Sequence, residues 1–286
     1  MPELPEVESV RRSIERAKID GPIVGVWRSR KKLRTGTQWR REKLRMLMDA
    51  QPGPIERRGK FIVWRFEVGD ASLGWLVHLG MSGRFVLSDP AQPREPHTHV
   101  VVDFGSGHQV RFVDPRRFGG MRVAPLERLL AESPLSDLGP EPLDPSFDGS
   151  VLERAAAHSK RALRDVLLDQ RIVAGVGNIY ANEALFEAGL HPLLPAYRLK
   201  QSAWNRLAEA VVLVLQRGLD NGGTTLRDYR DGDGQEGRNQ HALNVYGRAG
   251  EACRRCGETI RPFTHGNRNG AFCPHDQARS RARRIP

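Results

Sequence analysis

The sequence predicts a multidomain α+β protein in which a β domain is followed by a helical domain and a small cysteine-bearing unit. Three observations support this fold class. Short apolar segments separated by Gly, Asp and Pro recur through the first half, segments with helical periodicity fill much of the second half, and a Cys-x-x-Cys pair lies near the end. With 286 residues, the chain is long enough for about two domains with separate cores.

The first half is expected to begin with a helix and to continue with strands. Val7, Val10 and Ile14 have the spacing of one helix face over 5–18. Short alternating or apolar segments at regular intervals then indicate a β-sandwich or a β-barrel. The strands are expected at 22–28, 61–67, 73–79, 84–88, 99–104, 109–113 and 120–124.

The composition changes after residue 132. Pro, Gly and Asp are frequent in the segment that follows, which is predicted to be a linker. Helices are expected at 151–168, 179–188 and 202–217, and a mobile loop rich in Gly and Asp is expected at 231–237. The expected domains are 1–132 (β domain), 133–150 (linker), 151–243 (helical domain), 244–278 (cysteine unit) and 279–286 (basic tail).

The charge balance favours a polyanionic partner. Lys and Arg number 45 against 34 Asp and Glu, which gives a net charge of +11. Residues 244–286 alone hold nine arginines and three acidic residues, and a basic region of this kind favours nucleic acid because neutralised phosphates release counterions. No apolar stretch reaches transmembrane length and no signal peptide precedes the charged first helix. Three cysteines indicate a reducing compartment, and we expect a cytoplasmic protein.

The cysteine unit has the spacing of a structural zinc site. Cys253 and Cys256 form one knuckle, and Cys273 and Asp276 form a second after sixteen intervening residues. Two such knuckles are typical of one Zn²⁺ held on a β-hairpin. The fourth ligand is Asp276 or its neighbour His275, and the alternative is a hairpin that has lost its metal.

The first residues offer a nucleophile. A small second residue generally allows Met1 to be removed, which leaves Pro2 as a terminal secondary amine beside Glu3. An α-amino group titrates near ~8, so a useful fraction is neutral and can form a Schiff base with a carbonyl. The alternative is structural, because Pro5 suits the first turn of a helix and Glu6 suits its positive end.

Together these features resemble the bacterial formamidopyrimidine-DNA glycosylases of the formamidopyrimidine/endonuclease VIII superfamily. The resemblance covers nearly the whole chain. It rests on seven segments in order: Pro2–Glu8, Arg58–Lys60, His78–Gly83, Asp114–Gly119, 170–192, Gly222–Leu226 and Val245–Glu251. It implies a β-sandwich preceded by a helix, then a helix-two-turn-helix domain and a β-hairpin zinc finger, with duplex DNA in the cleft between them. It also implies a monomer.

The resemblance implies a role for each of five residues. Pro2 would attack C1′ of the damaged nucleotide, and Glu3 would act as the general acid that protonates the sugar ring oxygen. Glu6 would lie in the lesion pocket. Lys60 would be the proton donor in β-elimination, and Arg268 would bind phosphate and take part in δ-elimination.

Further positions match DNA contacts of the family. A base inside a duplex must be flipped out and its place filled. The glycine turn at 175–177 suits phosphate binding at the start of a helix, although glycine also ends helices. The residues that fill this gap in the family, called wedge residues below, correspond to Met81, Arg116 and Phe118. The residues that contact the DNA in the family correspond to His97, Arg116, Lys160 and Asn178.

The sequence therefore predicts a bifunctional DNA glycosylase and AP lyase of base excision repair that removes oxidised purines, with 8-oxoguanine and formamidopyrimidines as substrates. One alternative is an endonuclease VIII-like member that favours oxidised pyrimidines. The other is a non-catalytic protein that binds damaged DNA, although such a protein would have no need of Pro2, Glu3 and Lys60.

Overall fold

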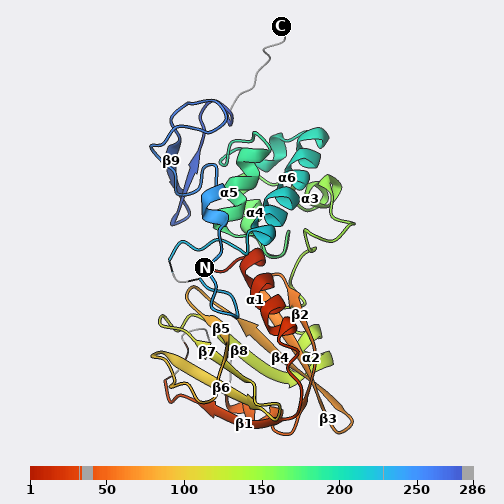
Figure 1. Ribbon diagram of the computed structural model, residues 1–286. Coiled ribbons are helices and arrows are strands. Elements are labelled where there is room, and N and C mark those ends of the chain that lie inside the picture. Colours follow the sequence, from red (N-terminus) through yellow and green to blue (C-terminus); the bar gives the residue numbers. More distant parts are fainter. Residues whose placement is uncertain (32, 34–40, 228, 279–286) are drawn as a thin grey trace. The chain divides into compact units, whose positions relative to one another are not determined.

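The computed structural model describes residues 1–31, 33, 41–227 and 229–278 (Figure 1). The chain forms two compact units. Unit 1 comprises Met1–Asp137 and Gly218–Gln240, and unit 2 comprises Leu138–Arg217 and His241–Pro286. The segment Gly218–Gln240 therefore packs with the β unit, although it follows the helices in the sequence. The predicted basic tail, 279–286, lies outside the described residues.

Unit 1 contains two four-stranded antiparallel sheets, of strand order β1-β6-β7-β5 and β2-β3-β4-β8. They share one core, so the fold is a sandwich. The seven expected strands are present. The strands are β1 (Ile23–Arg28), β2 (Gln51–Arg58), β3 (Phe61–Val68), β4 (Ala71–His78), β5 (Arg84–Ser88), β6 (Thr98–Phe104), β7 (Gln109–Val113) and β8 (Gly120–Pro125).

Strand β2 was not predicted from the sequence. Pro52 and Pro54 interrupt it, and a proline cannot donate a hydrogen bond to a neighbouring strand. The strand forms because it lies at the edge of its sheet, where it pairs only with β3. This strand matters for the site because its last residue, Arg58, leads into the turn that carries Lys60.

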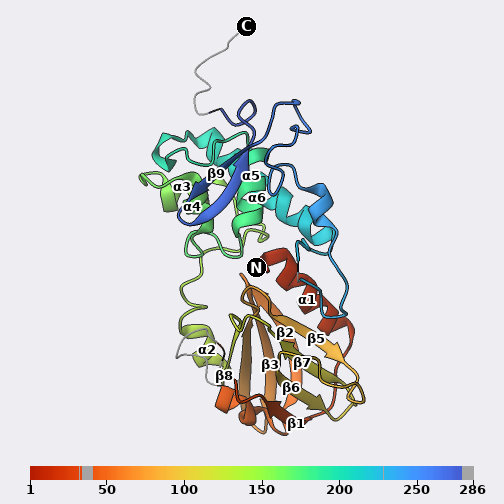
Figure 2. The same cartoon turned by 90° about the vertical axis from the view of Figure 1, so that its left-hand side faces the viewer.

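Aromatic rings fill the space between the two sheets. Trp64 and Trp75 stack with ring centroids 6.3 Å apart, and Phe85 meets Trp75 edge-on at 5.1 Å. Burying each such side chain contributes about 1.5–3 kcal/mol or more. Helix α1 (Leu4–Arg16) adds Val7 and Val10 to the same core. It lies beside the strands (Figures 1 and 2) and contacts β2, β3 and β5. The core thus fixes the helix whose first turn bears the predicted nucleophile.

Unit 2 is helical, with a small hairpin near its end. The expected helix at 151–168 is in fact two helices, because the chain leaves the helix at 157–162. There, the backbone N–H groups of Ala196 and Tyr197 donate to the carbonyls of Arg161 and Ser159. The helices are α3 (Gly149–Ala156), α4 (Leu163–Leu168), α5 (Asn178–Glu187) and α6 (Gln201–Asp220), and the hairpin strands are β9 (Arg261–His265) and β10 (Arg268–Phe272).

Short helical segments occupy several connections, at η1 (Arg41–Leu47), α2 (Leu126–Ala131), η2 (Ala196–Arg198) and η3 (Asn239–Ala242). The loop at 231–237 was expected to be mobile, but it is bound to the sandwich. Its Gly232 carbonyl accepts from the Leu87 backbone N–H, and Asp233 pairs with Arg16 at 2.8 Å. Glycine content alone suggested mobility, whereas these long-range contacts hold the loop. No helix within the described ranges is long and apolar enough to cross a membrane.

Candidate active site and metal centre

The first turn of α1 buries the predicted nucleophile and two carboxylates. Pro2 is buried, and Glu3 and Glu6 are 2% and 1% exposed. The Glu3 backbone N–H donates to Glu6 Oε2 at 2.8 Å, which is one half of a capping box. The second carboxylate oxygen of Glu6 accepts from the Thr224 backbone N–H at 2.7 Å. Glu6 therefore attaches the loop at 222–225 to the start of α1.

Tyr229 strengthens this attachment. Its hydroxyl lies 3.2 Å from both the Glu6 carbonyl and the Gly222 carbonyl. Burial raises the pKa of Tyr229, and the charge of Glu6 raises it further, so the phenol keeps its proton for donation. Gly223 has a φ of +89°, and a Cβ atom there would lie 3.0 Å from Glu6 Cγ, so this close approach favours glycine. Sequence reasoning did not single out Tyr229.

Lys60 lies in the two-residue turn between β2 and β3 and is only 6% exposed. The other turn residue, Gly59, has a φ of +56°, as tight hairpin turns require. Arg57 connects this turn to α1. Its Nε donates to Glu8 at 3.3 Å and its Nη1 donates to the Gly59 carbonyl at 3.1 Å. The lysine turn is therefore attached to the helix that begins beside Pro2.

His78 is a half-buried neighbour of Lys60 that sequence reasoning did not assign. Burial, together with the positive charge of Lys60, lowers the pKa of His78 to about 4, so the ring is neutral at pH 7. The Gly80 backbone N–H donates to His78 Nδ1 at 3.2 Å, which places the ring proton on Nε2. His78 thus carries a directed N–H donor beside the lysine without adding positive charge.

The three predicted wedge residues lie on two adjacent loops. Met81 is 42% exposed, and the Arg116 guanidinium lies 5.0 Å above the Phe118 ring. Asp114 organises both loops from a buried position: it accepts from the Ser82 hydroxyl at 2.6 Å and from the Gly119 N–H at 2.7 Å. Its motif was recognised, but its organising role became visible only in the structure.

His97 is the remaining predicted DNA contact of unit 1. It is exposed, and its φ of +67° lies in the left-handed region, which is uncommon for a residue with a side chain. Its carbonyl accepts from the Asp114 N–H at 3.0 Å. The same buried aspartate residue that orders the wedge loops therefore also fixes the backbone at His97.

In unit 2, Asn178 begins helix α5 after the glycine turn. Its Oδ1 accepts from Arg164 at 2.7 Å, and its Nδ2 donates to the Asn269 carbonyl at 2.9 Å. The Gln170 side chain stabilises the turn by accepting from the Gly175 N–H and donating to the Val176 carbonyl. Arg164 is fully buried, so it orients Asn178 from inside the unit.

Lys160 and Arg268 are exposed cations of unit 2. Lys160 lies in the break between α3 and α4, and Arg268 begins β10. Because each side chain reaches solvent, both can approach a phosphate. The structure thus places Pro2, Glu3 and Glu6 at one helix start in unit 1 and attaches the Lys60 turn to the same helix through Arg57. In unit 2 it places Asn178 near Arg268, because Asn178 donates to the carbonyl of the next residue, Asn269.

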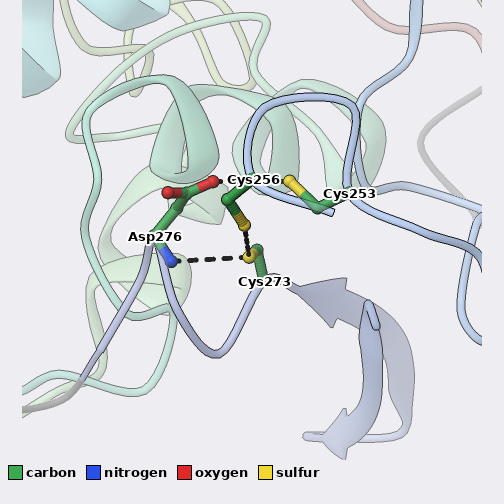
Figure 3. Close-up of side chains that lie close together, drawn as sticks. All are labelled: Cys253, Cys256, Cys273 and Asp276. Carbon is green, nitrogen blue, oxygen red and sulfur yellow. Dashed lines mark hydrogen bonds between the residues drawn. The ribbon is translucent and has the colours of Figure 1, made fainter. Parts of the chain in front are cut away.

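Cys253, Cys256, Cys273 and Asp276 converge at one end of the hairpin (Figure 3). Their four ligand atoms lie within 4.8 Å of one another. Tetrahedral zinc, with Zn–S bonds of about 2.3 Å, requires ligand atoms separated by about 3.8 Å. Burial raises the pKa of Cys273 to about 12, so a metal must displace the thiol proton. The donor set fits a structural Zn²⁺, which would be held by these four residues.

Asp276, not His275, belongs to this cluster. The carboxylate is buried and lies 3.3 Å from Cys253 Sγ. The His275 side chain is 68% exposed, and its Nδ1 lies 3.2 Å from Asp276 Oδ1. Burial opposes ionisation of Asp276, but hydrogen bonds from His275 and Cys253 lower its pKa below the usual value. His275 therefore orients the ligand from outside the metal site.

Changing Asp276 should change zinc retention in a defined order. We expect Asp276→Ala to lose zinc to a chelator fastest, because the variant leaves three thiolates and one open position. Asp276→Cys should retain zinc longest, and His275→Ala should weaken affinity by about 10- to 100-fold, as outer-shell changes do. Metal content after timed chelation measures this order. Full retention in Asp276→Ala would exclude the carboxylate as a ligand.

A buried Pro2, which becomes the terminal amine once Met1 is removed, lies beside two carboxylates, and the same unit carries the lysine turn and the wedge loops. Together with a separate helical unit that bears a zinc finger, these features define a class of protein: a DNA glycosylase that also acts as an AP lyase. The family models agree. The formamidopyrimidine-DNA glycosylase N-terminal domain matches residues 1–121, the H2TH domain of the same enzymes matches 138–230, and the zinc finger found in FPG and IleRS matches 250–279.

Relatives match over nearly the full length. The formamidopyrimidine-DNA glycosylases of Moorella thermoacetica and Stutzerimonas stutzeri are 42% and 41% identical, covering 91% and 97% of this chain and 93% and 100% of theirs. A Lactococcus lactis FPG mutant in complex with Fapy-dG containing DNA matches with a TM-score of 0.87 at 33% identity, covering 97% of this chain and all of that one. The complex of that FPG with an abasic site containing DNA gives 0.85, again at 33% identity, covering 96% and 99%. The chain belongs to the formamidopyrimidine-DNA glycosylase family.

Proposed function

We propose that the chain removes oxidised purines, 8-oxoguanine and formamidopyrimidines, from duplex DNA through a Schiff base on Pro2. The observation that carries this proposal is the burial of Pro2, Glu3 and Glu6 at the start of α1, with the Lys60 turn attached to the same helix through Arg57. Likeness to FPG bound to Fapy-dG containing DNA supports the substrate class.

The Pro2 nitrogen attacks C1′ after Met1 has been removed, and the bond between C1′ and the damaged base breaks. The N–H proton of Pro2 passes to the departing base, so the displacement is balanced. Glu3 donates a proton to the ring oxygen, so the sugar opens and an iminium forms between Pro2 and C1′. Burial of Glu3 keeps this acid away from bulk water. Glu6, whose two oxygens each accept from a backbone N–H, lines the lesion pocket in a fixed orientation.

The iminium then makes the C2′ proton acidic. Loss of that proton forms the C2′–C3′ double bond and breaks the C3′–O3′ bond, which is β-elimination. Loss of the C4′ proton and breakage of the C5′–O5′ bond follow as δ-elimination, and water releases the sugar fragment from Pro2. Lys60 is the proton donor in β-elimination, and Arg268 binds the phosphate that leaves in δ-elimination.

The remaining predicted residues hold the DNA. Met81 and Phe118 fill the space left by the extruded nucleotide, and Arg116 faces the orphaned base. The exposure of Met81 and Arg116, the partial exposure of Phe118 and the hydrogen bonds from Asp114 to both loops favour this role. His97, Lys160 and Asn178 contact phosphates. We also infer that the enzyme works in the cytoplasm, because its zinc site requires reduced thiols.

Borohydride trapping on a duplex with 8-oxoguanine opposite cytosine tests the proposal. Reduction of the iminium should produce a covalent complex of one chain and one DNA strand, and mass spectrometry of the digested complex should place the sugar remnant on Pro2. An undamaged duplex is the matched control. A remnant on Lys60, or no adduct with a chain whose Met1 is removed, would refute the assignment of the nucleophile.

A further inference from the structure

The turn of the zinc-finger hairpin has a defined geometry. Gly266 and Asn267 are the two turn residues, and both have positive φ values, +54° and +59°. Two successive left-handed residues form the tight turn that matches the twist of the flanking strands. Across this turn, His265 pairs with Arg268 in the strand register. The position of His265 therefore determines the backbone position of Arg268.

His265 is attached to helix α4, which lies beside the hairpin (Figure 2). Its Nε2 lies 2.7 Å from Asp165 Oδ2, and its carbonyl accepts from Arg164 Nη1 at 3.0 Å. Asp165 and His265 are 31% and 41% exposed. Partial exposure distinguishes this pair from Arg164, which is buried and cannot be removed without opening the interior of the unit.

The strand after the turn is attached as well. Asn178 donates to the Asn269 carbonyl at 2.9 Å, and the Ala271 N–H donates to Asn182 Oδ1 at 3.3 Å. Arg268 thus lies between two attached residues, His265 before the turn and Asn269 after it. An isolated two-stranded hairpin is at best marginally stable in water, so these attachments to α4 and α5 determine how rigidly the turn is held.

We propose that Asp165 and His265 are positioning residues that hold the turn against α4, so that Arg268 meets the phosphate that leaves in δ-elimination. The inference rests on the role of Arg268 proposed above. Neither residue touches the DNA in this scheme. A displacement of about 1 Å at a positioned group can cost up to 100-fold in rate, so loss of one attachment should be measurable.

The experiment measures the two elimination steps separately. With a preformed abasic site, single-turnover reactions give the ratio of δ- to β-elimination products, and an 8-oxoguanine duplex gives the rate of base excision. We expect Asp165→Ala and His265→Ala each to lower the product ratio about tenfold, with base excision and zinc content unchanged. The double variant should be no worse than either single variant, because the two changes remove one interaction. His265→Gln should restore the ratio.

Glu258→Ala is the matched charge control, since it removes an exposed carboxylate from the finger that carries Arg268 and leaves the contact between Asp165 and His265 intact. Its product ratio should equal that of the unchanged chain. An unchanged product ratio in Asp165→Ala would overturn the inference. An equal loss of zinc, DNA binding and both elimination steps would also overturn it, because that result indicates a general loosening of the finger.

Arg268→Ala separates the two proposals. If it lowers the ratio and Asp165→Ala does not, the positioning role alone fails, whereas an unchanged ratio in Arg268→Ala removes the role of Arg268 and the inference with it.

Discussion

A chain whose Pro2 nitrogen remains acylated is expected to lose base excision and strand cleavage together, by on the order of a thousandfold or more. An amide nitrogen has no available lone pair for attack on C1′. The effect should exceed that of any substitution in the DNA contacts, because those contacts affect binding and not the bond-forming atom.

A chain with a removable N-terminal extension provides the matched pair for this test. Before cleavage Pro2 is acylated, and after cleavage the protein is identical except for the free amine. Borohydride trapping and single-turnover excision are measured on both forms. Equal trapping by the two forms would show that another amine is the nucleophile. Pro2→Gly adds a second comparison, since it keeps a terminal amine but loses the ring.

Glu3→Gln is expected to separate the two activities of the enzyme. Loss of the acid should slow excision of an intact damaged nucleotide by about 10²- to 10⁴-fold, which is the usual contribution of general acid catalysis. Cleavage at a preformed abasic site should change far less, because its open sugar already presents an aldehyde to Pro2. Both rates are measured under single-turnover conditions on the same DNA sequence.

Glu15→Gln is the control for this prediction. It makes the same chemical change on the exposed face of α1, where Glu15 pairs with Arg11, so it should leave both rates unchanged. Thermal unfolding checks that Glu3→Gln has not weakened the start of the helix. If Glu3→Gln slowed both reactions equally, Glu3 would instead serve a step common to both, such as iminium formation.

The sequence predicted much of the fold because its signals are local. The helical spacing of Val7, Val10 and Ile14 indicates α1 whatever surrounds it. Alternating apolar residues indicate strands in the same way. The prediction failed where a distant partner decides the outcome. Pro52 and Pro54 argue against a strand, yet β2 forms because β3 pairs with it at the edge of the sheet.

The same division applies to the candidate site. The motifs at Pro2, Lys60 and the four zinc ligands are visible in the sequence because the chemistry requires those residue types at those spacings. The residues that hold these motifs in place cannot be identified from the sequence. Arg57 is one of many arginines until it is seen to connect Glu8 with the Gly59 carbonyl. Asp276 was the first candidate for the fourth ligand and His275 the second, and burial in the structure decided between them.

The N-terminus, the lysine turn and the cysteine unit show what the sequence determined and what the tertiary structure determined. The sequence alone established a possible terminal nucleophile, a neighbouring acid, a second amine and a cysteine unit suited to zinc, because these follow from the identity and order of residues. Only the tertiary structure decided that Glu6 is held by Thr224, that His78 is neutral beside Lys60, and that Asp165 reaches His265. Those properties depend on burial and on contacts between residues far apart in the chain, which the order of residues does not reveal.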